Sequence, residues 1–367
     1  MLFFSPGRVN LIGEHTDYNG GYVFPCALSL GTYASVRKRN DSLIRFASAN
    51  FPLRVSSDIN NLVYDAEDGW ANYMKGVAFQ FKMANYEING ADILIEGNLP
   101  NGAGLSSSAS IELLMGVILN TLFECNIDRR EMAIMGRAAE NDFVGMNCGV
   151  MDQYAVAMGK KDCALLLNCN KITHEYVPLR IDGYKLIISN TNVRHQLASS
   201  EYNIRRKESE RALKFLKQKY DIQYLCQLAP EQFEADKNMI EDEVARRRAE
   251  HAIYENARVL EAVEALKKGN LKRFGVLMNL SHISLRDLYE VTGPELDAMA
   301  EEAWKITGVL GSRMTGGGFA GCTVSLVDIN SVDEFIREVG KNYQRRTGLT
   351  PDFYLADIGD GAKQFFM

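Results

Sequence analysis

The spacing of apolar residues along this chain changes between the short period of strands and the longer period of helices. Alternation in residues 32–36 and 43–47 predicts strands. Residues 91–96 (ADILIE) are apolar and β-branched, which predicts another strand. After a polar loop, apolar residues recur at helical spacing: Ile111, Leu114, Met115, Ile118, Leu119 and Leu122. The first part of the chain therefore contains a strand that turns through a loop into a helix.

Further helices are predicted over residues 68–83, 128–142 and 241–268, and strands over 163–169 and 184–189. In the helix over 241–268, the arginines at 246–248 are expected on a solvated face. The residues expected to face inward there are Val244, Ile253, Ala257, Leu260 and Val263. A helix over 332–343 and a strand over 353–356 complete a pattern typical of a small α+β domain.

The chain is too long for one ordinary domain, since it has 367 residues. The segment 174–182 is polar enough to carry a domain boundary, which we place near Pro178. We therefore predict an N-terminal domain over residues 1–178 and a C-terminal domain over 179–367.

Composition narrows the class of protein. With 46% hydrophobic and 24% charged residues, the chain is typical of a soluble globular protein, and no apolar run reaches the length of a membrane span. The net charge of -6 argues against nucleic-acid partners, because these need clustered positive charge. The seven cysteines form no CxxC pair, which favours a reducing cytoplasm and gives no support to structural zinc. We expect a cytoplasmic monomer or weak oligomer whose partners are small molecules.

The loop over residues 100–110 (PNGAGLSSSAS) has the composition of a phosphate site. Gly102 and Gly104 let the backbone approach an anion, and the free N–H groups at the following helix N-terminus attract it. Three serines at 106–108 add hydroxyls for phosphate oxygens or Mg²⁺. The loop lacks the lysine of a Walker A motif and the third glycine of a dinucleotide fingerprint. The structural alternative is a serine-capped helix after a flexible turn.

A second segment, residues 5–21 (SPGRVNLIGEHTDYNGG), is too polar for a core strand. It places Arg8 in the same short stretch as Glu14, His15 and Asp17, a cluster of acceptors that suits the hydroxyl groups of a sugar. The Asn-Gly pair near its end predicts a hairpin turn. We expect a turn that also carries ligand contacts.

Three further residues are candidates for chemistry. Asp152 lies among small and apolar residues in CGVMDQY, where a carboxylate is costly unless it is paired or used. Its structural alternative is a helix cap or a buried acceptor. Glu140, near the end of the helix over 128–142, is by itself typical of a solvated face. Trp70 belongs to an aromatic helix whose rings either fill the core or flank an adenine.

Together these segments resemble the GHMP kinase superfamily. PGRVNLIGEHTDYNGG is similar to the galactokinase signature, GLSSSAS to the family's ATP loop, CGVMDQ to its catalytic segment and MTGGGFAGC to its third motif. NVRHQLASSEYNIRR resembles a further galactokinase segment. The resemblance implies an α+β protein with the two-domain GHMP kinase fold. Its N-terminal α/β domain would have a mixed sheet, its C-terminal domain would be ferredoxin-like, and the active site would lie between them.

The resemblance also implies a reaction, the transfer of the γ-phosphoryl of ATP to the anomeric hydroxyl of D-galactose with Mg²⁺. Asp152 would lie beside the attacking hydroxyl, as a full base or an electrostatic guide, and Arg8 near the transferred group. The implied sugar contacts are Glu14, His15, Asp17, Gly149, Asp152 and Tyr202. The implied nucleotide contacts are Gly102, Gly104, Leu105, Ser106, Ser107, Ser108 and Trp70, and the implied Mg²⁺ ligands are Ser108 and Glu140. A kinase for N-acetylgalactosamine or arabinose, or a galactose sensor without turnover, is the alternative.

Overall fold

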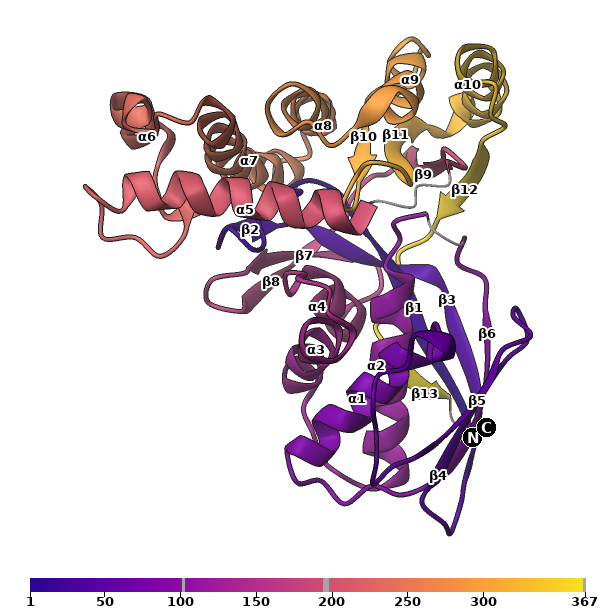
Figure 1. Cartoon of the computed structure of the whole chain (residues 1–367). Helices are drawn as coiled ribbons and strands as arrows, with labels where there is room; N and C mark the ends of the chain where they lie inside the picture. The colour runs from indigo at the N-terminus through magenta and orange to yellow at the C-terminus, as the bar shows by residue number, and fades with distance from the viewer. Residues whose placement is uncertain (101–102, 194–197, 366–367) are drawn as a thin grey trace.

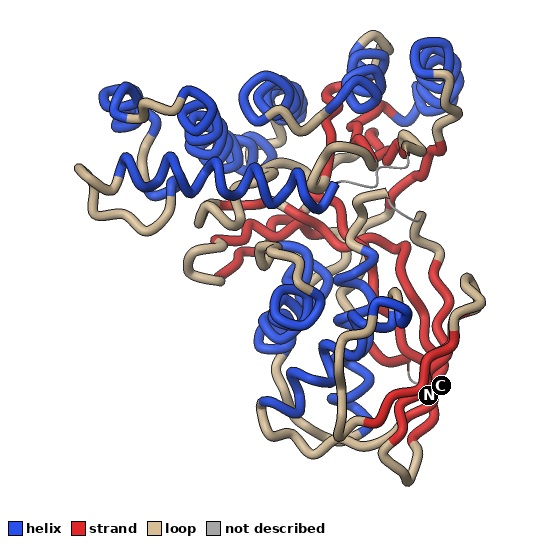
Figure 2. Tube along the Cα trace, viewed as in Figure 1, coloured by secondary structure: helices blue, strands red, loops and turns tan. Residues whose placement is uncertain are grey.

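The computed structural model describes residues 1–100, 103–193 and 198–365 of the chain. Helices pack beside a large sheet in the lower half of Figure 1, and a second group of helices lies around a smaller sheet in the upper half. Strands and helices are interleaved along the chain in both halves (Figure 2). The predicted α+β class is therefore confirmed.

A six-stranded sheet with the order β13-β1-β3-β6-β4-β5 organises the lower half. Its strands are β1 (Leu2–Asn10), β3 (Pro25–Lys38), β4 (Leu43–Ser48), β5 (Arg54–Asp58), β6 (Ala91–Gly97) and β13 (Lys363–Phe365). Strands β4 and β6 are parallel and the other neighbours are antiparallel, so the sheet is mixed, as predicted. Because β13 pairs with β1, the two ends of the chain meet in this sheet (Figure 1).

Helices cover one face of this sheet: α1 (Ala71–Met83), α2 (Ser107–Leu122), α3 (Arg129–Ala138) and α4 (Met151–Met158). The alternation in β6 explains the packing, because Ile93 and Ile95 are buried whereas Leu94 is 49% exposed on the other face. The apolar positions that we predicted in α2 are all buried in the same core. The apolar faces of these helices and strands thus pack together into one continuous core.

A small antiparallel sheet joins β2 (Tyr22–Val23), β7 (Cys163–Asn168) and β8 (Thr173–Pro178). We expected residues 174–182 to be a polar connection, but the first part of this segment belongs to β8. Val177 is the one buried residue of β8, whereas Thr173, Glu175 and Pro178 are exposed. Because so little of β8 is buried, its residues show no clear apolar alternation, and the strand was not predicted.

The upper half contains a four-stranded antiparallel sheet with the order β10-β11-β9-β12. Its strands are β9 (Tyr184–Asn190), β10 (Val309–Thr315), β11 (Cys322–Asp328) and β12 (Asp352–Ala356). Ile187 and Val327 pack against α9 (Gly293–Trp304) and α10 (Val332–Thr347). Leu186 and Ile188, on the opposite face, share a core with Val9 of β1. The two halves of the molecule are therefore joined by packed apolar side chains.

The remaining long helices are α5 (Ala198–Leu216), α6 (Pro230–Asp236), α7 (Glu243–Lys267) and α8 (Leu271–Ser284). In α7 the predicted facing is partly wrong, because Val244 and Leu260 are 38% and 39% exposed. Arg248, expected on a solvated face, is 2% exposed because it pairs with Glu208 of α5. Helix α7 thus buries Arg248 along with Ile253, Val263 and Leu266, whereas two of its predicted inward residues are exposed.

Two short turns are π-helical, η2 (Ala139–Val144) and η5 (Leu285–Tyr289). The other short turns are 3₁₀ helices: η1 (Ala66–Asp68), η3 (Leu225–Gln227), η4 (Lys237–Met239) and η6 (Ile329–Ser331).

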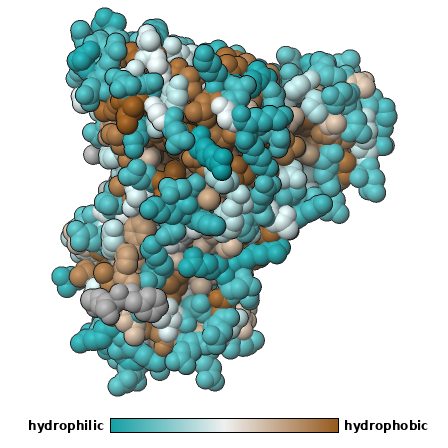
Figure 3. Space-filling model, turned by 180° about the vertical axis from the view of Figure 1, so that it is seen from behind, coloured by the Kyte–Doolittle hydropathy of each residue, from teal (hydrophilic) through white to brown (hydrophobic). Residues whose placement is uncertain are grey.

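Seen from behind, the surface is largely hydrophilic with scattered apolar patches (Figure 3). Within the described ranges, no helix combines the length and the apolar character needed to cross a membrane.

Candidate active site

The loop before α2 leaves the first N–H groups of that helix available to a ligand. Ser106 is the N-cap residue, in the left-handed region with a φ of 59°, and its side chain makes no cap hydrogen bond. The structural alternative of a serine-capped helix is therefore not supported. Gly104 also has a positive φ, and the side chain of Leu105 is buried, so Leu105 offers a ligand only its backbone. The predicted contact at Gly102 lies outside the described residues.

A cavity of about 340 Å³ opens beside the start of α2. Ser107 and Ser108 line it, together with the aromatic rings of Trp70 and Tyr73 and the side chain of Ile111. Trp70 also packs on the N-terminal core, so one ring both fills the core and lines the cavity, and its contact with an adenine stays a prediction. Its buried indole Nε1 has no hydrogen-bond partner among the described residues. An apolar, aromatic cavity that ends at a helix N-terminus suits a base whose phosphates point toward that helix.

Arg8 and Asp152 form a two-pronged ion pair. Nε of Arg8 donates to Oδ1 of Asp152 and Nη2 donates to Oδ2, both at 2.9 Å. The third prong, Nη1, donates to the carbonyl of Gly104 at 2.7 Å, and the Ser106 hydroxyl donates to Asp152 at 2.5 Å. Strand β1, the serine loop and the first turn of α4 therefore meet at one carboxylate, and the structural alternative of a simple cap does not describe Asp152.

A second cavity, of about 150 Å³, adjoins this ion pair. Its lining includes eight residues predicted for the site: Arg8, Glu14, His15, Asp17, Glu140, Gly149, Asp152 and Tyr202. Tyr202 comes from α5, Asp152 from α4 and Glu14 from the turn after β1. Residues spread over most of the chain thus surround a space of sugar size, rich in carboxylates.

Glu14 is held rigidly in this cavity. Its carboxylate accepts from the Asn10 amide at 2.7 Å, from the backbone N–H of Gly316 at 2.8 Å and from Arg313 at 3.3 Å. Arg313 is itself fully buried and also donates to the Asn10 carbonyl and the Ser281 hydroxyl. Strand β10 and the glycine-rich turn after it therefore fix the orientation of the Glu14 carboxylate beside the cavity.

Asp17 and Gly149 face each other closely. A Cβ built on Gly149 would lie 1.8 Å from Oδ2 of Asp17, so the glycine contributes space and no side-chain contact. Burial raises the pKa of Asp17 to about 7, with the backbone N–H of Tyr18 opposing the shift. Burial destabilises the ionised form of this carboxyl, and hydrogen bonds donated by a ligand would stabilise it. The site therefore favours a ligand with hydrogen-bond donors.

Glu140 is buried, contrary to the expectation of a solvated face. Burial raises its pKa to about 7, while the hydroxyl of Ser108 and the amide of Gln153 lower it. The Gln153 amide donates to Glu140 at 2.6 Å and to Glu112 at 2.9 Å. Within residues 1–100, 103–193 and 198–365, no three His, Cys, Asp or Glu side chains gather as a metal site. Ser108 and Glu140 place two side-chain oxygens close together, and their role as Mg²⁺ ligands stays a prediction.

Several supporting residues of the site were not predicted from the sequence. Gln153 was part of the quoted CGVMDQ segment, and Arg313 directly precedes the MTGGG segment, so their motifs marked both positions. Glu112 lies in α2 two residues after the GLSSSAS motif, and Tyr289 ends η5, so both fall outside the quoted segments. Their roles come from contacts between residues far apart in the chain.

Family models match most of this arrangement. The model for the GHMP kinases N terminal domain matches residues 72–160, the GHMP kinases C terminal model matches 262–345, and the galactokinase galactose-binding signature matches 1–38. A mevalonate kinase from Methanococcus jannaschii, 17% identical, shares the fold with a TM-score of 0.72 over 98% of both chains. The fold and site thus define a GHMP kinase, with the predicted N- and C-terminal architecture.

Close relatives show which family of GHMP kinases the chain belongs to. A galactokinase from Bacillus subtilis is 53% identical over 366 residues, which cover 99% of this chain and 94% of the relative. One from Fusobacterium nucleatum is 55% identical over 364 residues, covering 98% and 94%. The crystal structure of Lactococcus lactis galactokinase complexed with galactose matches with 46% identity and a TM-score of 0.97, over 99% of this chain and 95% of the other. The chain belongs to the galactokinase family and is an ATP-dependent sugar kinase, which confirms the resemblance predicted from its motifs.

Proposed function

We propose that this galactokinase phosphorylates the anomeric hydroxyl of D-galactose with Asp152 and Arg8 at the reacting atoms, giving galactose 1-phosphate and ADP. The observation that carries the assignment is the two-pronged Arg8–Asp152 pair. The pair contacts Gly104 in the loop before α2, and it also lines the second cavity, the one of about 150 Å³. The anomeric oxygen of the sugar attacks the γ-phosphorus, the bond from that phosphorus to the β–γ bridging oxygen breaks and releases ADP, and the hydroxyl proton passes to the carboxylate of Asp152. Positioning and charge neutralisation do most of the work in such a transfer.

Asp152 is better suited to orient the attacking hydroxyl than to remove its proton early. Its oxygens already accept hydrogen bonds from Arg8 and Ser106, and these contacts fix the direction in which the carboxylate faces the attacking hydroxyl. The guanidinium of Arg8 lies where it offsets negative charge on the transferred group. The reaction then depends on the orientation of the pair, and the proton leaves late.

The nucleotide would occupy the cavity beside α2, with its base against Trp70 and its phosphates at Ser106, Ser107 and Ser108. Mg²⁺ fits the pair Ser108 and Glu140, because a buried carboxyl with a raised pKa gains from a nearby cation. Mg²⁺ usually takes few protein ligands beside substrate phosphates and water, which agrees with a two-residue site. When bound, it would neutralise charge on the phosphates.

The sugar would occupy the second cavity, with Glu14, His15, Asp17 and Tyr202 contacting its hydroxyls. Gly149 would allow this placement by leaving room for the Asp17 carboxyl. A site that pairs each hydroxyl rejects an analogue in which one is missing or misplaced, on the order of 10⁴-fold when the unpaired groups are buried.

Three wider assignments belong to the same proposal. The chain divides near Pro178 into domains 1–178 and 179–367, with β13 returning to the first. We expect a monomer or weak oligomer. A cytoplasmic location agrees with seven cysteines that are all free thiols.

One assay tests the function. ADP release is measured with ATP, Mg²⁺ and a panel of galactose, N-acetylgalactosamine, arabinose, glucose and no sugar. Galactose should give the highest kcat/KM and glucose a very poor rate. Preference for N-acetylgalactosamine would support the alternative kinase, galactose binding without ADP release would support a sensor, and equal rates on glucose and galactose would contradict the hydroxyl-reading site.

A further inference from the structure

Four side chains form a chain of hydrogen bonds from α5 to the sugar cavity. The hydroxyl of Ser209 lies 2.7 Å from that of Tyr289, which lies 2.9 Å from the hydroxyl of Tyr18. Tyr18 in turn lies 2.8 Å from Nδ1 of His15. Ser209, Tyr289 and His15 are buried and Tyr18 is half-buried, so water has little access to these contacts.

The hydrogens of this chain have two complete arrangements, because each hydroxyl carries one hydrogen. Oγ of Ser209 also lies 3.2 Å from the carbonyl oxygen of Arg205, which only accepts. If Ser209 donates to that carbonyl, Tyr289 donates to Ser209 and Tyr18 donates to Tyr289. The Nδ1–H of His15 then donates to Tyr18. The reverse arrangement loses the bond to the carbonyl, so the first arrangement makes one more hydrogen bond and places the imidazole hydrogen on Nδ1.

This tautomer leaves Nε2 of His15 as an acceptor. Nε2 is buried and has no hydrogen-bond partner among the described residues, and His15 lines the sugar cavity. Burial lowers the pKa of His15 to about 3, so the ring is neutral and carries one hydrogen. The backbone of Gly317 raises that pKa as a hydrogen-bond partner of the ring and so favours a hydrogen on Nε2, although Nε2 has no partner at full hydrogen-bond geometry among the described residues. The hydroxyl chain, whose three contacts all lie at 2.9 Å or less, is the stronger influence on the tautomer.

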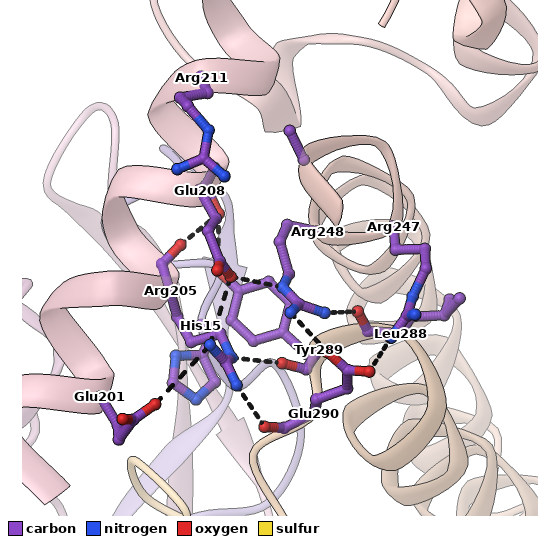
Figure 4. Close-up of polar contacts among 12 residues, drawn as sticks. His15, Glu201, Arg205, Glu208, Arg211, Arg247, Arg248, Leu288, Tyr289 and Glu290 are labelled. Atoms are coloured by element: carbon purple, nitrogen blue, oxygen red, sulfur yellow. Dashed lines mark hydrogen bonds and ion pairs between the residues drawn. The ribbon is translucent and has the colours of Figure 1, made fainter. Parts of the chain in front are cut away.

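Tyr289 is held firmly enough to control this arrangement (Figure 4). It ends the π-helical turn η5, and its carbonyl accepts from Nε of Arg205 at 2.8 Å. Glu290, which comes next with a φ of 56°, accepts from Nη2 of Arg205 at its carbonyl and from buried Arg248 at its carboxylate. Arg248 also binds Glu208 of α5 at 2.7 Å. Charged contacts from two helices thus fix the backbone that carries the ring.

We propose that Tyr289 is a positioning residue for sugar recognition: through Tyr18 it holds His15 in the Nδ1–H tautomer, so that Nε2 accepts a hydrogen bond from one galactose hydroxyl. Tyr289 does not line the sugar cavity, so it acts through His15, whose ring centroid lies 4.7 Å from its own. The inference rests on the proposed placement of the sugar beside His15.

The tautomer is tested without turnover, by ¹⁵N–¹H correlation spectra of the histidine rings in the full chain without ligands. The wild type should carry its hydrogen on Nδ1 of His15. In Tyr289→Phe, Tyr18 loses its acceptor and donates to Nδ1 instead, so the hydrogen should move to Nε2, toward the Gly317 carbonyl. A wild-type hydrogen on Nε2, or an unchanged tautomer in the variant, overturns the proposal.

Selectivity is tested with galactose and its 2-, 3-, 4- and 6-deoxy analogues. In the wild type, the analogue that lacks the hydroxyl read by His15 is penalised. In Tyr289→Phe this penalty should shrink about tenfold, the value of one neutral hydrogen bond, while the other penalties stay the same. An equal loss for every sugar would indicate a merely structural role and overturn the proposal. Absence of galactose turnover in the wild type would instead contradict the proposed function and leave the spectra to decide the tautomer.

Two further variants complete the design. Tyr154→Phe is the matched control, because the Tyr154 hydroxyl is also bonded to a histidine Nδ1, that of His174, at 2.9 Å, and neither residue lines the sugar cavity. It should keep the wild-type selectivity profile. Ser209→Ala removes the first link and serves if Tyr289→Phe fails to fold. It should give a mixture of His15 tautomers, and a pure Nδ1–H form there would overturn the proposal.

Discussion

Replacement of Gly149 by alanine is the sharpest perturbation of the sugar site. The added Cβ would lie 1.8 Å from Oδ2 and 2.4 Å from Cγ of Asp17. Gly149 is not among the residues with a positive φ, so the alanine backbone itself fits. The variant therefore changes the position of one carboxylate and leaves the chemistry of every side chain in the cavity intact.

The magnitude comes from the displacement. Real Cβ contacts do not fall below 3.0 Å, so Oδ2 has to retreat by about 1.2 Å. A misplacement of about 1 Å in a positioning group costs on the order of 10²-fold, which corresponds to about 2.7 kcal/mol. We expect kcat/KM for galactose to fall by about this factor, while the Kd for ATP stays unchanged because the nucleotide cavity does not include Asp17.

Steady-state ADP release at varied galactose concentrations, with a nucleotide titration, measures both quantities. Gly340→Ala is a matched control, since its Cβ would meet the Phe353 ring at 3.2 Å, a crowded contact in α10 outside both cavities. It should retain wild-type kcat/KM. If Gly149→Ala also retains it, the Asp17 carboxyl does not place the sugar and the reasoning is refuted.

Four other predictions are testable. Asp152→Asn should lose most turnover but keep nucleotide binding by titration; near-normal turnover would remove Asp152 from its role. Ser108→Ala and Glu140→Gln should weaken the Mg²⁺ response of the rate, and an unchanged response in both would disprove the metal assignment. With the second tryptophan replaced by phenylalanine, Trp70 fluorescence should change on ATP addition, and a constant signal would exclude it from the nucleotide site. Because folding raises the pKa of Asp17 from 3.8 to about 7, stability falls as pH rises between these values. Asp17→Asn should therefore raise Tm at pH 8 relative to the wild type in thermal unfolding, and a lowered Tm would contradict the shift.

Much of the fold could be predicted because the relevant patterns are local. The strand over 91–96 and the apolar positions of α2 were predicted from periodicity, and both were confirmed. The proximity of Arg8 and Asp152 is different, since 144 residues separate them and no local pattern relates them. Only the family resemblance brought them together before the structure was known. Local sequence patterns thus predict individual helices and strands. Contacts between residues far apart in the chain are learned from a family resemblance or from the structure.

Arg248 illustrates how a local rule fails. A run of arginines on a helix is usually solvated, and the prediction relied on that rule. A buried charge is tolerated where a partner compensates it, and Glu208 and Glu290 supply two carboxylates from other elements. Neither partner is a neighbour of Arg248 in sequence. The burial of a charged residue is therefore a property of the packed elements, and the sequence of one helix does not contain it.

Two π-helical turns in the described residues carry side chains that belong to the site or support it. Glu140, predicted as a Mg²⁺ ligand although a lone glutamate there is typical of a solvated face, belongs to η2 and is buried beside Ser108. Tyr289 ends η5 and reaches Tyr18 from another helical layer. A π-turn inserts one residue into the helical period and so rotates the residues after it, and such turns are frequent at functional sites. In this enzyme the two interruptions of the 3.6-residue pattern carry Glu140 of the proposed metal site and Tyr289, which supports His15.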